Sequence, residues 1–148
     1  LAHCAAHFKG FAPLATVEPQ DWLESLQVNV TGPFALTRHC LPLLEQSDAA
    51  AVVFVSDACG RGGKAYAGPY GVAKFAVEGL MQAWALELEA MRVRVNSLDP
   101  GPMDTALRRK GYAEAARAPS PQTAAQALLW LLGPDSAPAT GTAFSLRA

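Results

Sequence analysis

The stretch AAAVVFVSDACGRGGKAYAGPYGVAK, residues 49–74, runs from an apolar segment through a polar loop into a helical pattern. Residues 49–55 are apolar without alternation, which is typical of a parallel strand that helices cover on both faces. The helical pattern begins near Pro69, a residue suited to the first turn of a helix. A strand, a loop and a helix in this order indicate an α/β fold with a parallel sheet.

The rest of the chain repeats this alternation of short strands and amphipathic helices. Further strands are predicted at residues 1–5, 93–98 and 143–146, and helices at residues 19–44, 69–89 and 123–132. Parallel strands joined by right-handed crossovers place helices on the faces of the sheet. Ligands of such sheets bind beyond the carboxyl ends of the strands, where residues 101–121 form a long irregular segment and a candidate lid.

The two longer helices carry apolar stripes at helical spacing. The stripe of the first helix includes Trp22, Leu26, Leu36 and Cys40. The second helix has one stripe of Tyr70, Lys74, Val77, Met81, Trp84 and Leu88, and another of Ala73, Ala76, Leu80 and Ala83. A helix with two apolar sides lies centrally in the domain or also contacts a partner subunit.

Composition limits the classes of function. The chain has 148 residues, 51% hydrophobic, and a formal net charge of -1, as expected of one soluble globular domain at residues 1–148. This charge predicts neither nucleic acid nor a membrane surface as partner, and no apolar run reaches the roughly 20 residues that cross a bilayer. Three widely spaced cysteines indicate reduced thiols and a cytoplasmic location. We expect no metal site, because His3, Cys4 and His7 lack a fourth ligand.

Tyr70 and Lys74 are one helical turn apart and follow the loop that leaves the strand at residues 49–55. A free tyrosine titrates near 10, and an adjacent ammonium group stabilises its phenolate and lowers that pKa. Such a pair transfers a proton to or from an alcohol oxygen. Taken alone, a Tyr-x-x-x-Lys match is more often a pair of surface residues, so the surrounding sequence has to decide.

Asn29 and Pro33 supply part of that context. Proline has no N–H, so within a helix Pro33 leaves the Asn29 carbonyl without its usual donor, and with Gly32 a local kink is expected. The freed carbonyl is a candidate to hold an ordered water near the tyrosine and lysine. The alternative is a Gly-Pro break that only bends the helix.

A rigid turn follows the strand at residues 93–98, with the sequence NSLDPGPMDT at residues 96–105. Two prolines and a glycine expose backbone amides and a threonine hydroxyl where a cofactor can lie. The alternative is an ordinary connection between a strand and a helix.

Together, these stretches resemble the short-chain dehydrogenase/reductase family, with its bacterial NAD(P)-dependent members the most similar. The residues that match the family pattern at the family's spacing are Tyr70, Lys74, Asn96, Pro100, Gly101 and Thr105, and Asn29 falls on its active-site asparagine. Matches of lower specificity are Gly60, Ala73, Phe75, Ala76, Gly79 and the turn Thr140-Gly141. The match extends over nearly the whole chain.

The resemblance implies an oxidoreductase that moves a hydride between nicotinamide, as NAD or NADP, and the carbon of a small carbonyl or alcohol substrate. It implies a catalytic group of Tyr70 as general acid/base, Lys74, and Asn29 as holder of the relay water. The cofactor-binding residues it implies are Ala5, Tyr70, Lys74, Pro100, Gly101, Met103 and Thr105. It also implies a homodimer or homotetramer, with the helices at 19–44 and 69–89 in the dimer interface.

The sequence departs from the family in its first part. The glycine-rich dinucleotide loop is absent, and the chain begins at the family's fourth strand, with Cys4 in place of an asparagine. We therefore expect the second half of a doubly wound Rossmann-like sheet, strands 4 to 7, with one open edge. Without the glycine-rich loop, the cofactor's pyrophosphate lacks its helix N-terminus.

The second departure is Asp57, which stands thirteen residues before Tyr70, at the position of the family's catalytic serine. An ionised carboxylate accepts hydrogen bonds but cannot donate one to a substrate oxygen. At about 4 Å and an effective dielectric constant near 20, its repulsion of a phenolate is roughly 4 kcal/mol. Ser56 is adjacent, but neighbouring strand residues point to opposite faces, so it is not expected to substitute. Asp57 predicts weak or absent dehydrogenase activity.

Two functions therefore stay open. The first is a short-chain dehydrogenase, and the second is a truncated or impaired relative that acts as a dimerisation or binding partner without catalysis. The substrate is not readable: the candidate lid holds Met103, Leu107 and Tyr112, which suit an apolar pocket, and also Arg108, Arg109 and Lys110, which either meet an anion or face solvent.

Overall fold

The computed structural model describes residues 1–146 and contains a four-stranded parallel sheet of order β1-β2-β3-β4. Its strands are β1 (Ala2–His3), β2 (Ala51–Val55), β3 (Arg94–Asp99) and β4 (Ala143–Ser145). Within residues 1–146, β1 pairs only with β2, so one edge of the sheet is open, as predicted. The expected first strand at residues 1–5 is shorter than the sequence suggested.

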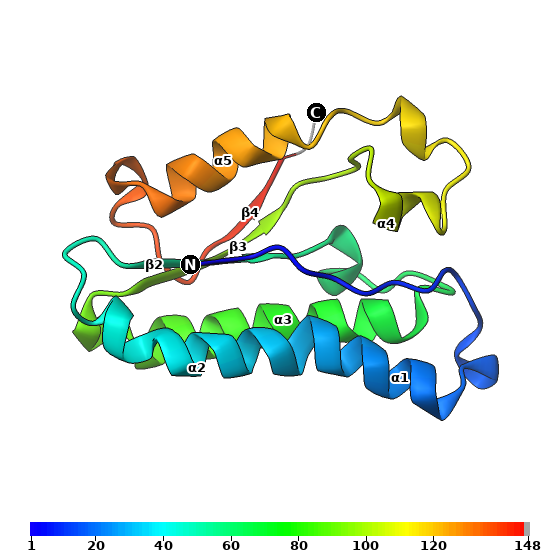
Figure 1. Cartoon of the computed structure of the whole chain (residues 1–148), viewed down its shortest axis with the longest axis horizontal. Coiled ribbons are helices and arrows are strands. Elements are labelled where there is room, and N and C mark those ends of the chain that lie inside the picture. Colours follow the sequence, from blue (N-terminus) through cyan, green and yellow to red (C-terminus); the bar gives the residue numbers. More distant parts are fainter. Residues whose placement is uncertain (147–148) are drawn as a thin grey trace.

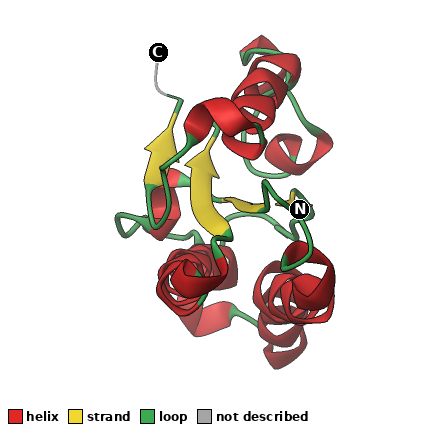
Figure 2. Cartoon of the chain, turned by 90° about the vertical axis from the view of Figure 1, so that its left-hand side faces the viewer, coloured by secondary structure: helices red, strands yellow, loops and turns green. Residues whose placement is uncertain are grey.

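Helices cover both faces of the sheet (Figure 1). One face is covered by α1 (Pro19–Leu26), α2 (Gly32–Leu44) and α3 (Gly68–Glu87), and the other by α5 (Gln122–Leu132). The end-on view in Figure 2 shows the resulting three layers. Short helical turns occupy Leu14–Thr16, Ala58–Gly60, Glu89–Met91, Ala115–Arg117 and Pro134–Ser136. This is the predicted α/β, Rossmann-like half-sheet.

Alternate residues of β2 bury themselves on opposite faces. Val52 and Phe54 pack into one cluster with Met81 of α3, whereas Val53 packs with Leu131 of α5. All are almost fully buried, which explains why the segment is apolar without alternation. Each such side chain contributes about 1.5–3 kcal/mol through burial, so this strand anchors both layers.

The predicted helix at residues 19–44 is interrupted near Pro33. Residues Gln27–Thr31 form a π-helical turn in which the N–H of Gly32 donates to the Gln27 carbonyl, five residues earlier. The missing N–H of Pro33 favours this wider turn, which confirms the expected irregularity and gives it a specific form. The predicted apolar stripe is only partly buried, because Leu36 is 49% exposed.

The stripe of α3 that begins at Tyr70 is buried, apart from the half-buried Tyr70 itself. In the second stripe Ala73 is buried, Ala76 and Leu80 are partly buried, and Ala83 is exposed. The lid region is not wholly irregular, since it contains the short helix α4 (Ala106–Arg109). Among residues 1–146, no helix is both long enough and apolar enough to span a membrane.

Candidate active site

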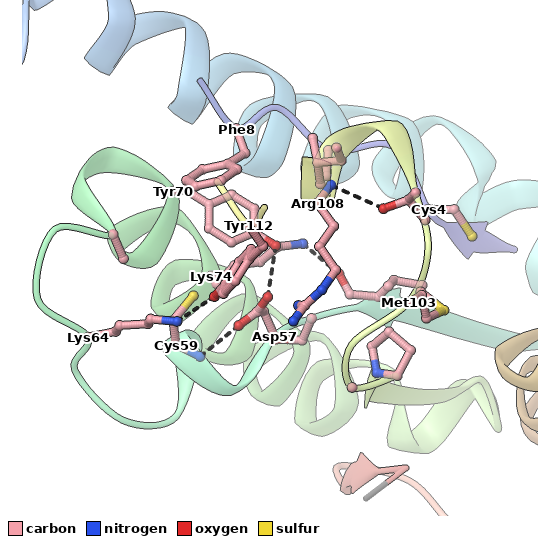
Figure 3. Close-up of a pocket in the computed structure, with 18 of the residues that line it drawn as sticks. Cys4, Phe8, Asp57, Cys59, Lys64, Tyr70, Lys74, Met103, Arg108 and Tyr112 are labelled. Atoms are coloured by element: carbon pink, nitrogen blue, oxygen red, sulfur yellow. Dashed lines mark hydrogen bonds between the residues drawn. The ribbon is translucent and has the colours of Figure 1, made fainter. Parts of the chain in front are cut away.

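A cavity of about 290 Å³ lies at the carboxyl ends of β2 and β3, where ligands of such sheets are expected. Four parts of the chain line it: the segment after β1, the loop after β2, the start of α3, and the loop with α4 after β3 (Figure 3). Seven of the predicted site residues meet there: Asp57, Tyr70, Lys74, Pro100, Gly101, Met103 and Thr105. Ala5 and Asn29 are not among the lining residues.

The start of α3 brings Tyr70 into this pocket. Gly68, the first residue of α3, adopts a positive φ of 55° that favours glycine, and Pro69 follows it in the first turn. The Tyr70 ring packs at 5.1 Å, centroid to centroid, against Phe8 from the segment after β1. Its hydroxyl donates to Oδ2 of Asp57 at 3.2 Å.

Lys74 lies one turn further along α3, on the same face. Its side chain is 3% exposed, its Nζ donates to the Val55 carbonyl at 2.7 Å, and it lies 5.5 Å from the Tyr70 ring centroid. Burial lowers the pKa of this ammonium, and the negative charge of Asp57 opposes that shift. The predicted juxtaposition of Tyr70 and Lys74 is present.

Asp57 is held by its own loop as well as by Tyr70. Its Oδ1 accepts from the Cys59 N–H at 2.9 Å and caps the helical turn at Ala58–Gly60. Gly60 allows this loop to contact α3, because a Cβ there would lie 2.7 Å from the Lys74 carbonyl. Both carboxylate oxygens of Asp57 therefore have donors within the protein.

The pKa of Tyr70 is raised, first because its hydroxyl is buried and next because of the Asp57 charge. The rise agrees with the expectation that the charge of Asp57 opposes phenolate formation. The phenol of Tyr70 therefore stays protonated at neutral pH. The expected opposing effect of Lys74 on this pKa stays a prediction.

Asn29 fastens the segment after β1 to the helical layer. It is 2% exposed, its Oδ1 accepts from the His7 N–H at 2.9 Å, and its Nδ2 donates to the carbonyls of His7 at 2.9 Å and Ser25 at 2.8 Å. These bonds position the segment that supplies Phe8 to the pocket.

The loop after β3 forms the opposite wall. Oδ1 of Asp99 accepts from the Gly101 N–H at 2.9 Å, and Gly101 has a φ of 68° that favours glycine. A Cβ on Gly101 would also lie 2.8 Å from the Leu146 carbonyl. Thr105 caps α4 by accepting from the Arg108 N–H at 3.2 Å, which sets the direction of that helix.

Sequence reasoning missed several lining residues. The pocket also contains Phe8, Phe11, Lys64 and Ser56. Ser56 was expected to face away from the site, but β2 ends at Val55, so strand alternation does not apply to it. Its Oγ is buried and has no hydrogen-bond partner within residues 1–146. No pattern in the sequence marks these four, since loops far apart in the chain bring them together.

Comparisons with known proteins agree with this geometry. The family model described as short chain dehydrogenase matches residues 1–116. The uncharacterized oxidoreductase YciK of Escherichia coli strain K12 is 40% identical over 147 residues, which are 98% of this chain and 58% of YciK. The 3-oxoacyl-[acyl-carrier-protein] reductase FabG of Thermotoga maritima is 29% identical, over 88% of this chain and 57% of FabG.

Solved structures show the same similarity. A putative short chain dehydrogenase of Escherichia coli CFT073, complexed with NADPH, superposes with a TM-score of 0.94 and 38% identity, over 99% of this chain and 62% of the other. A Shigella flexneri 2a relative complexed with NADP gives a TM-score of 0.92 and 38% identity, over 97% of this chain and 61% of the other. The chain thus spans about three fifths of the length of these relatives.

Proposed function

The chain belongs to the short-chain dehydrogenase family, and we propose that its pocket performs the proton-transfer part of an NAD(P)-dependent reduction of a small carbonyl compound. The observation that carries this proposal is the Tyr70 hydroxyl, which lies in a pocket at the carboxyl ends of the strands with buried Lys74 one helical turn away. The cofactor, when bound, supplies the hydride.

The protonated form of Tyr70 is the form that reduction of a carbonyl uses. Reduction of a carbonyl requires a proton at the new alcohol oxygen, and a protonated phenol provides one. Oxidation of an alcohol requires a phenolate to accept a proton, and the raised pKa of Tyr70 disfavours that form. The buried ammonium of Lys74 stabilises the phenolate that reduction leaves behind.

Asp57 limits the rate of this reaction. Its Oδ2 accepts the Tyr70 proton in a hydrogen bond of 3.2 Å, which competes with a bond from the same hydroxyl to a substrate oxygen. It also supplies no donor to that oxygen as charge develops in the transition state. We therefore propose slow turnover compared with relatives that have a serine here.

The residues on the other wall fit the nicotinamide end of a cofactor. Pro100, Gly101, Met103 and Thr105 line the pocket together with Tyr70 and are largely apolar, and a flat ring packs against such a surface. In this pocket, that wall and Lys74 are the groups we propose to contact the nicotinamide end of a bound cofactor.

Cofactor titration tests the proposal. NADPH and NADH are each added to the chain while the fluorescence of the reduced nicotinamide is followed, and we expect saturable binding of at least one. A Lys74→Met variant should bind more weakly, because it removes the buried cation, while Lys110→Met, on an exposed lid residue, should bind as the wild type does. Binding that does not saturate, or that both variants leave unchanged, contradicts the proposal.

A second experiment measures turnover. It uses a fusion protein in which the dinucleotide-binding segment of a relative precedes Leu1. Tyr70→Phe should then lower kcat by about 10²–10⁴-fold, because it removes the proton donor. Tyr66→Phe is the control, since Tyr66 is 62% exposed and does not line the pocket.

A second candidate function is association without catalysis, in the cytoplasm, as the sequence predicts. It rests on large apolar side chains that α2 and α3 expose: Phe34 at 41%, Leu36 at 49%, Val72 at 40% and Phe75 at 47%. Sedimentation equilibrium tests it, with a dimer or tetramer expected for the wild type and a monomer for Phe75→Asp. A wild-type monomer contradicts it.

A further inference from the structure

The lid carries two neighbouring arginines with different surroundings. The guanidinium of Arg109 is paired with Asp104, whose Oδ1 accepts from Nε at 3.0 Å and from Nη2 at 2.7 Å, and this pair lies near solvent. Arg108 instead lines the pocket, with its guanidinium carbon 4.0 Å from the ring centroid of Tyr112. Its Nε is buried and has no hydrogen-bond partner within residues 1–146.

Lys64 brings a second cation to the same aromatic ring. It comes from the loop between β2 and α3, donates to the Tyr112 hydroxyl, and lies 4.7 Å from the Tyr112 ring centroid and 4.9 Å from that of Phe11 (Figure 3). Among residues 1–146, neither Lys64 nor Arg108 forms an ion pair with a carboxylate. Two cations from different parts of the chain thus meet at Tyr112.

The pocket as a whole has an excess of positive charge. Its charged lining residues are three cations, Lys64, Lys74 and Arg108, and one carboxylate, Asp57. Both oxygens of Asp57 already accept hydrogen bonds, from the Cys59 N–H and from the Tyr70 hydroxyl. Within residues 1–146, the Arg108 side chain has a buried Nε without a hydrogen-bond partner and forms no ion pair. A partly desolvated cation of this kind favours an anionic ligand.

An aromatic wall joins this cationic end to the proton donor. The rings follow one another from Tyr70 to Phe8, Phe11 and Tyr112, with centroid distances of 5.1, 5.2 and 5.1 Å. A ligand that reaches both ends packs its apolar body against this wall. Leu107 and Met103 add to the apolar lining.

We propose that the pocket selects carbonyl substrates that carry a carboxylate, which Arg108 and Lys64 bind beside Tyr112. Arginine suits this role because its planar fork of donors matches the two oxygens of a carboxylate. The placement of the substrate carbonyl at Tyr70 rests on the proposed function. The placement of the carboxylate at Arg108 and Lys64 rests only on these two cations and the aromatic wall.

The test is calorimetric titration of the chain with 4-oxo-4-phenylbutanoate, which has an aromatic body, a ketone and a carboxylate, and with its uncharged methyl ester. We expect the acid to bind at least about tenfold more tightly than the ester. Arg108→Gln and Lys64→Gln should each remove about tenfold of the affinity for the acid. Arg109→Gln is the matched control and should change it less than twofold.

Two results overturn the proposal: equal affinity for acid and ester, or an equal loss in Arg108→Gln and Arg109→Gln. A third result also overturns it: inorganic pyrophosphate binds in a way that depends on Arg108, while the acid does not bind. The two cations would then form a phosphate site and not a carboxylate site. Because Lys64 is exposed, Lys64→Gln decides the outcome if near-ultraviolet circular dichroism shows that Arg108→Gln does not fold.

The nicotinamide titration separates this inference from the proposed function. Binding of the acid that depends on Arg108, without binding of NADPH or NADH, supports the carboxylate site and contradicts the reductase. Binding of the cofactor, without binding of the acid, supports the reductase and overturns the carboxylate site.

Discussion

Two charged side chains one turn apart on α3, Lys74 and Glu78, are both buried but have opposite surroundings. Glu78 is 6% exposed, and its carboxylate accepts from Nε of Arg61 at 2.8 Å and from Oγ of Ser97 at 2.7 Å. Arg61 also donates to the Phe144 carbonyl at 2.9 Å, so this network ties the loop after β2 to β3 and β4. Within residues 1–146, Lys74 has one protein acceptor, the Val55 carbonyl, and it lines the pocket.

The difference shows that α3 carries one buried charge with a structural role and another with a functional role. A buried charge whose hydrogen-bonding atoms are all occupied by protein fixes the positions of its partners. A buried charge that faces a pocket keeps its potential available to a ligand. Glu78 therefore holds the loop that carries Asp57, while Lys74 acts on whatever the pocket binds.

The largest expected effect tests the scaffold. Glu78→Ala should lower the free energy of unfolding by about 3–5 kcal/mol, because it leaves Arg61 as an unpaired, largely buried cation. Urea denaturation followed by circular dichroism measures it. Glu87→Ala, on an exposed position of the same helix, should stay within about 0.5 kcal/mol of wild type. Equal losses in the two variants would show that the network is not structural.

The next effect tests the chemistry. Asp57→Ser should raise kcat by about 10²-fold in a chain that also carries a relative's dinucleotide-binding segment, because a hydroxyl replaces an acceptor with a donor. Asp57→Asn is the control, since it removes the charge without restoring the hydroxyl, and it should give a smaller gain. If Asp57→Ser shows no gain in turnover, the rate-limiting role of Asp57 is wrong.

A third prediction concerns a buried group that stays neutral. His3 is 8% exposed, its Nε2 lies 2.8 Å from Oγ1 of Thr37, and burial lowers its pKa to about 4. The unfolded chain binds a proton near pH 6.5 and the folded chain only near pH 4, so stability falls as the pH drops through that interval. The slope should be at most about 1.4 kcal/mol per pH unit.

The measurement is urea unfolding at several pH values between 7 and 4. His3→Gln keeps a polar side chain but does not titrate, so the slope attributed to His3 should be absent from it. An unchanged slope would assign the acid sensitivity to other groups.

The smallest expected effect returns to Lys74. Lys74→Met should leave the free energy of unfolding within about 1 kcal/mol of wild type, because removal of a buried ammonium offsets the lost hydrogen bond to Val55. If Lys74→Met lowered the free energy of unfolding as much as Glu78→Ala, Lys74 would be as structural as Glu78 and the distinction between them would be wrong. The same variant should weaken cofactor binding, which a merely structural lysine would not affect.

The sequence predicted the layered architecture well, for a reason that residues 49–55 illustrate. A segment buried on both faces has to be apolar throughout, so its pattern reports its place in the fold. The first strand was placed less well, because its length depends on pairing with β2 and not on its own residues. The interrupted first helix was foreseen at Pro33, but not its π-helical form.

The site was predicted in part. Asp57, Tyr70 and Lys74 lie together because a loop and one helical turn fix their spacing. The expected role of the Asn29 carbonyl stays a prediction, whereas the sequence did not show that its side chain holds the segment at His7, a contact between residues 22 positions apart in the chain. Arg108 and Arg109 look equivalent in the sequence, and only the direction of α4 distinguishes them.

By itself, the sequence determined the α/β class, the Tyr70 and Lys74 pair and the acid at Asp57, since each follows from local spacing and side-chain chemistry. The tertiary structure alone decided that Asp57 accepts a hydrogen bond from the Tyr70 hydroxyl and that Lys64 and Arg108 meet at Tyr112. The physical reason is that the geometry of a helical turn is set by its own backbone, whereas contacts between loops are set by the packing of the whole domain.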